Sequence, residues 1–405
     1  MLPVNRVGKA AVVLFLLLCA SWYWHETVIT VIPGMGDPSD FKPYWEAASD
    51  IIHGQTPYVT NGYIYPPLLA CVLTPLAPLS YLKARWAWFA TSQLCLLLAA
   101  WLMWRAMGRD WLAACCVAFV WAVGDAAPET LALGQLGPPL TLLLVVAYTQ
   151  IDWRQAASVA LGLALKLIPG VLGIVFLLRR QWRMLGVLIG VTLLLLALPW
   201  SLVYCCLSGP KTPAGTDTWT GTPAILSWSL PSVALRIVDS PAPAGPLPPD
   251  WEFGNDLPNL HLPAYLRWLS VSVAAVVLLS GLAIWLATLR HGLSAAQVPF
   301  AMAALLALSL AASPVCWTHY QVMEYPGVAL LLGHASRARR WTLLAWTFIV
   351  GALLYPAPVQ ILRYLAMKDG NWKLISHSAL YGWTSVTPVA SVAMFALLLY
   401  QAKRA

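Results

Sequence analysis

Long apolar runs separated by short polar segments dominate the chain. Runs of membrane-spanning length occupy residues 10–32, 82–107, 185–207, 266–289 and 380–400. A hydrocarbon core of ~30 Å needs about 20 apolar residues in helical form, so each run predicts a membrane-crossing helix. The pattern therefore indicates an all-α protein that crosses a membrane several times.

Shorter apolar runs fill the spaces between the long ones, and we predict that they are shorter helices of the same bundle. One of them, residues 64–79, contains four prolines and predicts a re-entrant or interfacial piece, because irregular backbone at membrane depth is tolerated only beside protein or water. The others are residues 111–123, 140–148, 298–312, 322–334 and 341–355.

The run at residues 156–178 is long enough for one crossing but carries Lys166 and Pro169 in its middle. Arginines flank both of its ends, which favours two short helices that meet on the outer side near Lys166. With this hairpin the sequence predicts about twelve membrane helices, some of half length. Both termini then lie in the cytoplasm.

Two long outer loops are expected within this single transmembrane domain of residues 1–405. The first, residues 33–80, is rich in carboxylates and predicts an amphipathic interfacial helix that begins after Asp40. The second, residues 209–263, is rich in Pro, Gly and Trp. Its portion 225–238 predicts another helix lying on the membrane.

Composition agrees with this architecture, since the 405 residues are 60% hydrophobic and only 10% charged. The net charge of +8 does not indicate nucleic-acid binding, because the basic residues gather on the loops predicted to be cytoplasmic. We expect the lipid bilayer as a partner and no nucleic acid. The predicted cytoplasmic residues are Arg6, Lys9, Arg105, Arg109, Arg154, Arg179, Arg180, Arg183, Arg290, Arg337, Arg339, Arg340, Lys403 and Arg404.

Three residues stand out as candidates for chemistry. Asp40, at the start of the interfacial helix, fits either a helix cap or a general base. Lys166 is an intramembrane cation, which indicates either anion binding or a buried ion pair with an acid. His319 follows an outward span and fits either a hydrogen-bonded interfacial histidine or a ligand-binding one.

Five motifs together resemble glycosyltransferase family 87 of the GT-C superfamily. The first outer loop contains SDFKPYWEAASDIIHGQTPY and YIYPPLLACVLTPLAPL; LGQLGPPL, ALKLIPGVLGIVFLLRRQWR and SPVCWTHYQV follow downstream. The resemblance implies a GT-C membrane fold, a polyprenyl-phosphate sugar donor and a location in the bacterial inner membrane, with the active site on its outer side.

The resemblance implies that Asp40 is the catalytic general base. Lys166 and His319 are then expected to bind the donor phosphate, because a leaving lipid phosphate needs cations or donors beside it. Gln135, Tyr44, Tyr65 and Asp37 are assigned to substrate binding. Asp37 could instead support Asp40 or be a solvated acid, and solvation is the favoured interpretation for it. Outer basic residues that could also reach a phosphate are Arg85, Arg236, Arg363, Lys368, Lys373 and His377.

The resulting hypothesis is an inverting glycosyltransferase that moves one sugar, with mannose expected, from a polyprenyl phosphate to a lipid- or polysaccharide-linked glycan. Arabinofuranosyl transfer by the same fold is an alternative. The pattern of spans also fits a transporter or flippase of lipid-linked sugars, and a ligase that uses lipid-diphosphate donors. No cofactor is expected and no metal ligands are assigned, although a loosely held divalent ion stays open.

Overall fold

The regular structure is helical throughout the described residues, apart from one isolated bridge between Gln55 and Ser208. The predicted all-α class is therefore confirmed. The computed structural model describes residues 6–37, 39–60, 62–124, 126–212, 229–238, 264–290, 292–313, 316, 318–354 and 386–405.

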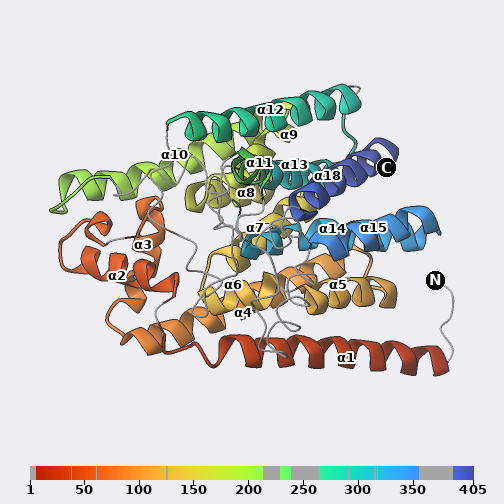
Figure 1. Ribbon diagram of the computed structural model, residues 1–405, viewed down its shortest axis with the longest axis horizontal. Helices are drawn as coiled ribbons and strands as arrows, with labels where there is room; N and C mark the ends of the chain where they lie inside the picture. Colours follow the sequence, from red (N-terminus) through yellow and green to blue (C-terminus); the bar gives the residue numbers. More distant parts are fainter. Residues whose placement is uncertain are drawn as a thin grey trace. The chain divides into compact units, whose positions relative to one another are not determined.

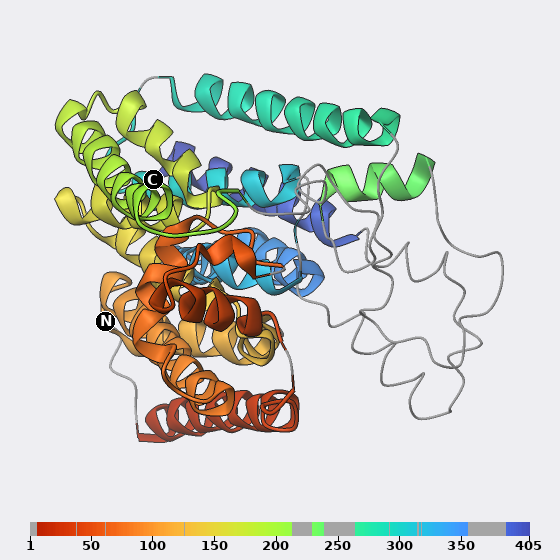
Figure 2. The same cartoon turned by 90° about the vertical axis from the view of Figure 1, so that its left-hand side faces the viewer.

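The helices group into two compact units. Unit 1 comprises Met1–Gly215 and Val322–Arg340, and unit 2 comprises Thr216–Gln321 and Trp341–Ala405. Figures 1 and 2 show their helices in two views. The expectation of one transmembrane domain stays a prediction.

Five helices in the described part of the chain are long and apolar enough to cross a membrane. In the most apolar window of each of the first four, only 11%, 28%, 22% and 17% of the residues are buried, so most of their apolar side chains lie on the surface. Such surfaces suit lipid rather than water, and the protein is accordingly a multi-pass membrane protein. The five helices are α1 (Arg6–Val31), α4 (Tyr81–Ala106), α10 (Trp182–Cys205), α12 (Ala264–Leu289) and α18 (Val386–Arg404).

A sixth span results if α5 (Trp111–Val123) and α6 (Ala126–Leu133), which are bent by 54° at their junction, count as one. Tyr325 fills this junction, because its hydroxyl accepts a hydrogen bond from the N–H of Ala127 at 3.0 Å. It lies so close to Gly124 that a Cβ there would meet the hydroxyl at 2.0 Å.

The shorter apolar runs also form helices, and α13 is the core of unit 2, with nearly every residue buried against α12 and α18. The expected number of about twelve membrane helices included such pieces; length and composition alone give five or six crossings among the described residues. The shorter apolar helices are α7 (Gly137–Thr149), α13 (Val298–Ala312), α15 (Trp341–Leu354), α3 (Pro67–Leu73) with η2 (Thr74–Leu76), and η3 (Ile168–Leu172) with α9 (Gly173–Leu178).

The chain breaks at Lys166, as predicted, where α8 (Trp153–Leu165) ends. It then folds back, since a Cβ on Gly170 would lie 2.6 Å from a methyl group of Leu163. Residues seven apart in a continuous helix are separated by about 10 Å along the axis, so this contact requires a reversal. The side chain of Lys166 is left at the turn between two short helices.

The second long outer loop is described only in part. Residues 229–238 contain α11 (Leu230–Val238), which packs along α12 (Figure 2). A helix was expected at 225–238, and α11 confirms it over Leu230–Val238; its position on the membrane stays a prediction. Residues 213–228 and 239–263 of the expected loop lie outside the described residues.

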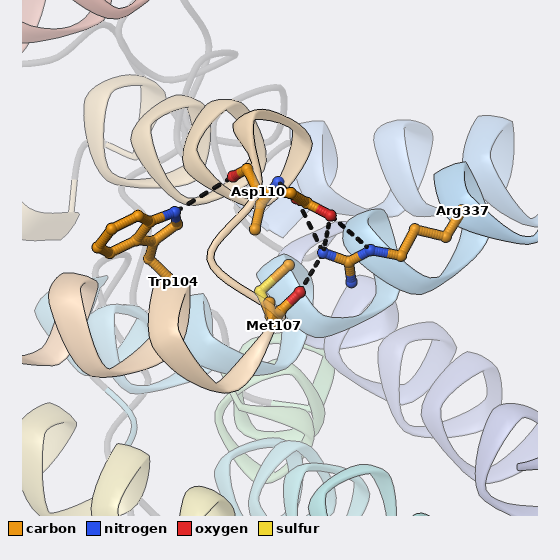
Figure 3. A network of polar contacts seen from close by, with 5 residues as sticks. Trp104, Met107, Asp110 and Arg337 are labelled. Carbon is orange, nitrogen blue, oxygen red and sulfur yellow. Dashed lines mark hydrogen bonds and ion pairs between the residues drawn. The ribbon is translucent and has the colours of Figure 1, made fainter. Parts of the chain in front are cut away.

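An ion pair fixes the end of α4 against α14 (Tyr325–Arg337) in unit 1 (Figure 3). Nε and Nη2 of Arg337 donate to the carboxylate of Asp110 at 3.0–3.2 Å, and Nη2 also donates to the carbonyl of Met107. The indole N–H of Trp104 donates to the carbonyl of Asp110 at 3.2 Å. The loop between α4 and α5 is thereby held from both sides.

Candidate active site

The loop expected at residues 33–80 contains the predicted helix, α2 (Phe41–Ile52). Its buried face consists of Phe41, Tyr44, Ala47 and Ala48, and it packs on α3 and α4. The sequence predicted an apolar face of Phe41, Tyr44, Trp45, Ala48, Ile51 and Ile52. Burial of Phe41, Tyr44 and Ala48 is confirmed, whereas Trp45 and Ile51 are half-buried and Ile52 is 47% exposed. Two acids of this loop have structural partners, because Glu46 pairs with Lys42 at 3.7 Å and Asp50 accepts a hydrogen bond from Thr60 at 2.6 Å.

Asp40 stands directly before α2, but its side chain does not cap the helix. Its backbone is already helical, at φ −60° and ψ −15°, whereas a capping residue is usually extended so that its side chain can reach the free amides. The hydroxyl of Ser39 accepts from the N–H of Phe41 at 3.4 Å instead. Of the two roles considered for Asp40, helix capping is thus not the one observed.

The carboxylate of Asp40 accepts a hydrogen bond from Nε2 of Gln135, at the turn between α6 and α7. Oε1 of Gln135 accepts from the hydroxyls of Tyr44 at 2.9 Å and Tyr65 at 3.4 Å. The two hydroxyls lie 3.0 Å apart, and the two rings meet edge to face at 5.1 Å. Because a carboxylate only accepts and these hydroxyls donate, the amide of Gln135 has one favourable orientation.

Lys166 approaches the same group of residues from the break after α8. Its Nζ lies 5.8 Å from the centre of the Tyr65 ring, within the range of a cation–π contact. The side chain of Lys166 is half-buried. Four residues predicted for the site from distant parts of the sequence, Tyr44, Tyr65, Gln135 and Lys166, therefore gather around Asp40.

The electrostatic surroundings of Asp40 keep it usable as a base. Burial by neighbouring protein atoms raises the pKa of its carboxyl group, while the hydrogen bond from Gln135 and the charges of Lys166 and Arg85 oppose that rise without cancelling it. Burial also raises the pKa of Tyr65 to about 12, so its hydroxyl stays protonated and can donate. Asp40 nevertheless keeps an exposed surface, through which a substrate hydroxyl can approach.

The two remaining predicted site residues are Asp37 and His319. Asp37 is exposed, and its main-chain carbonyl accepts a hydrogen bond from the hydroxyl of Tyr81 at 3.0 Å. His319 belongs to unit 2, where it is buried with its ring 4.7 Å from that of Tyr320. The roles of both residues stay predictions.

The outer basic residues fall into two groups. Arg85 is completely buried, so the expectation that it could meet a phosphate from the outside is wrong. It donates to main-chain carbonyls instead. The side chains of Arg236, Arg363, Lys368, Lys373 and His377 lie outside the described residues.

The arrangement supplies an accessible carboxylate whose pKa is raised, a nearby ammonium group and two oriented phenols. Such a carboxylate can take a proton from a hydroxyl within hydrogen-bond reach, and the ammonium can offset negative charge on a phosphate. Among the described residues no group of three or more His, Cys, Asp or Glu side chains is arranged to hold a metal ion.

Comparison with known proteins confirms the family resemblance. The model of glycosyltransferase family 87 matches residues 63–231, a stretch that includes Tyr65, Gln135 and Lys166 and begins after Asp40. A polyprenol-phosphate-mannose-dependent alpha-(1-2)-phosphatidylinositol mannoside mannosyltransferase of Mycobacterium tuberculosis is 28% identical over 314 residues, which are 72% of this chain and 66% of that protein.

More distant similarities extend to two further proteins. An alpha-(1->3)-arabinofuranosyltransferase of Mycobacterium tuberculosis is 26% identical over 192 residues, 43% of this chain and 44% of that protein. The matches thus span less than two thirds of the length of either relative. The crystal structure of ArnT from Cupriavidus metallidurans in the apo state superposes with a TM-score of 0.44 and 14% identity, over 98% of this chain and 78% of that one.

Proposed function

We propose that this chain, whose residues 63–231 match glycosyltransferase family 87, transfers one sugar from a polyprenyl phosphate to a hydroxyl of a lipid- or polysaccharide-linked glycan. The observation that carries the proposal is the state of Asp40. Its carboxylate does not cap α2; it accepts a hydrogen bond from Gln135 and stays partly exposed beside Lys166. A carboxylate with a structural role at this position would instead accept hydrogen bonds from the free amides of the helix.

The proposed reaction is a single displacement with inversion. The acceptor oxygen attacks the anomeric carbon while Asp40 takes the hydroxyl proton. The bond between that carbon and the phosphate oxygen breaks, and the lipid phosphate leaves with the electron pair. Lys166 binds the donor phosphate and also offsets the negative charge that develops on it as the bond breaks.

The orientation of this base is fixed by Gln135 together with Tyr44 and Tyr65. Gln135 holds one carboxylate oxygen, so the other is directed to the acceptor, and the two phenols fix the amide. Tyr65 is half-buried and can also contact a sugar ring, whereas Tyr44 is buried. We retain His319 as a further phosphate-binding residue and Asp37 as a substrate-binding or solvated residue.

The names of the relatives guide the identity of the sugar. One relative is named for polyprenol-phosphate-mannose and phosphatidylinositol mannoside, and the other for arabinofuranosyl transfer. We propose mannose as the sugar and arabinofuranose as the alternative. We further propose that the reaction takes place on the outer face of the bacterial inner membrane, with both termini in the cytoplasm.

Turnover by the purified protein tests the proposal. Protein in detergent is incubated with polyprenyl phosphate mannose and phosphatidylinositol mannosides, and released polyprenyl phosphate and elongated glycolipid are measured. We expect the two products in equal amounts. Parallel reactions with polyprenyl phosphate arabinose and with a lipid-diphosphate sugar identify the donor class.

The contrary outcome is also defined. In liposomes, a flippase would move the lipid-linked sugar across the bilayer without breaking the sugar–phosphate bond. Movement without cleavage, with no product from any of the donors, would overturn the transferase proposal.

A further inference from the structure

Arg85 lies in the first turns of α4 and is completely buried. Its Nη2 donates to the main-chain carbonyls of Leu131, at 2.9 Å, and Ala132. These carbonyls belong to the last turn of α6, where helical carbonyl groups have no partner within the helix. Nη2 carries two N–H bonds, so this one group can donate to both carbonyls.

The turn that follows α6 places Gln135. Gly134 adopts φ +70°, its N–H donates to Leu131, and the N–H of Gln135 donates back to Thr130. This pair of bonds is a Schellman ending, which favours glycine in the left-handed position. A Cβ at Gly134 would meet the Cβ of Phe41 at 2.7 Å and Nη1 of Arg85 at 2.8 Å, so the turn is tightly enclosed.

Trp88, one helical turn after Arg85, completes the enclosure. Its indole N–H donates to the carbonyl of Gly134 at 2.8 Å, and its ring stacks on Phe41 at 5.8 Å. Phe41 directly follows Asp40 and lies 5.9 Å from the guanidinium carbon of Arg85. The same face of α4 therefore holds both the turn that carries Gln135 and the chain that carries Asp40.

Resting on the proposed function, we infer that Arg85 is a positioning residue for the catalytic base: through its Nη2 group it fixes the turn that aims Gln135 at Asp40. Among the described residues, the other charged or titratable groups that act on Asp40 are Lys166 at the break after α8 and the phenol of Tyr65 before α3. Both lie on other elements, so the contribution of Arg85 can be measured separately.

Three variants separate the hydrogen bonds of Arg85 from its charge. Arg85→Met removes both, and Arg85→Lys keeps the charge but lacks the Nη2 group. Trp88→Phe removes a neutral hydrogen bond to the same turn. Transfer of mannose from a short-chain polyprenyl phosphate to phosphatidylinositol mannosides is measured from pH 4 to pH 9. Folding is checked by size exclusion and thermal unfolding.

Arg85→Met should lower kcat roughly 10- to 100-fold, because a small displacement of the base is costly. Since the charge of Arg85 lowers the pKa of Asp40, its removal should move the acidic limb of the kcat profile upward. Arg85→Lys should restore the limb but only part of kcat. Trp88→Phe should lower kcat and move the limb less than Arg85→Met does.

A purely structural role would give a different result. If the folded Arg85→Met protein keeps the acidic limb of the wild type, or if Trp88→Phe shifts it equally, the inference is wrong. Asp40→Asn is assayed in parallel: a folded, inactive Asp40→Asn protein leaves the proposed function standing when the Arg85 inference fails. An active Asp40→Asn protein would count against the proposed function itself.

Discussion

Asp40 and Asp110 each precede a helix of unit 1, α2 and α5 respectively, and they lie near opposite ends of α4. Asp110 has an extended backbone, and its carboxylate accepts from the N–H of Ala113 at 2.7 Å, as a helix cap does. Asp40 has a helical backbone and makes no capping bond. The same residue type at the same kind of position is thus used in two ways.

The surroundings of the two carboxylates shift their pKa values in opposite directions. Burial alone would raise the pKa of Asp110, but the hydrogen bonds from Ala113 and Arg337 and the charge of Arg337 bring it below its ordinary value. For Asp40 burial prevails over Gln135, Lys166 and Arg85, so its pKa is raised. A carboxylate whose lone pairs are committed to a cap and an ion pair is a weak base, whereas Asp40 keeps its basicity.

Substitution of the two aspartates by asparagine should separate these roles most clearly. Asp40→Asn should lower kcat for sugar transfer by roughly 10³- to 10⁴-fold, because an amide cannot take the acceptor proton. Asp110→Asn should leave kcat within about twofold, since Asp110 lies away from the group around Asp40. Initial rates on matched, folded preparations measure the difference, and equal losses in the two variants would refute the assignment of Asp40.

Removal of the ammonium group of Lys166 should act mainly on the donor. Lys166→Ala should raise the apparent KM for the polyprenyl-phosphate sugar by about tenfold, the loss expected for one hydrogen bond to a charged group. Lys42→Ala is the matched control, because Lys42 is a half-exposed lysine of the first outer loop that pairs with Glu46. An unchanged donor KM in Lys166→Ala would contradict the phosphate-binding role.

The orientation of Asp40 by Gln135 can be weakened in steps. Gln135→Leu should lower kcat about tenfold and move the acidic limb upward, because the hydrogen bond from Gln135 lowers the pKa of Asp40. Tyr44→Phe and Tyr65→Phe remove only the bonds that orient the amide and should lower kcat about two- to fivefold. A larger loss from the phenol variants than from Gln135→Leu would mean that the phenols act on substrate directly.

Much of this comparison could be predicted from the sequence. Apolar length placed the five long helices within a few residues, the amphipathic period placed α2, and a lysine with a proline placed the break at Lys166. The family resemblance selected Asp40. Each of these signals is local, or is carried by a motif of contiguous residues.

Long-range contacts could not be predicted in the same way. A sequence does not show whether an aspartate before a helix uses its side chain as a cap, since that depends on the backbone angles of Asp40 and on a partner 95 positions away. Arg85 was expected to reach a phosphate from the outside, yet it is buried under the α6–α7 turn. The sequence signal for that close packing was the glycine at position 134. The structure shows that it has a positive φ and no space for a Cβ.

Stability measurements test the structural side of the comparison. Asp110→Ala loses the cap and the ion pair with Arg337, which together contribute about 1–2 kcal/mol at this partly exposed site. Asp110→Asn keeps a good capping group and should lose less than half of that amount. Thermal unfolding in detergent checks the order. Equal destabilisation by both substitutions would mean that the ion pair, rather than the cap, holds the loop between α4 and α5.

The smallest expected effect is the dependence of stability on pH, which should have opposite signs at the two sites. Because the pKa of Asp110 is lowered by folding, its ionised form stabilises the protein at neutral pH, and this contribution is lost as pH falls through the folded pKa. The pKa of Asp40 is raised, so its contribution is present at low pH and is lost as pH rises through the folded pKa. Asp110→Asn should therefore melt below wild type at pH 7 and approach it only below the ordinary aspartate pKa of 3.8. Asp40→Asn should melt slightly above wild type at pH 7, by on the order of 1 °C, and lose that advantage at pH 4.

A destabilised Asp40→Asn protein at pH 7 would show that the fold depends on the Asp40 carboxylate, and the contrast with Asp110 would fail.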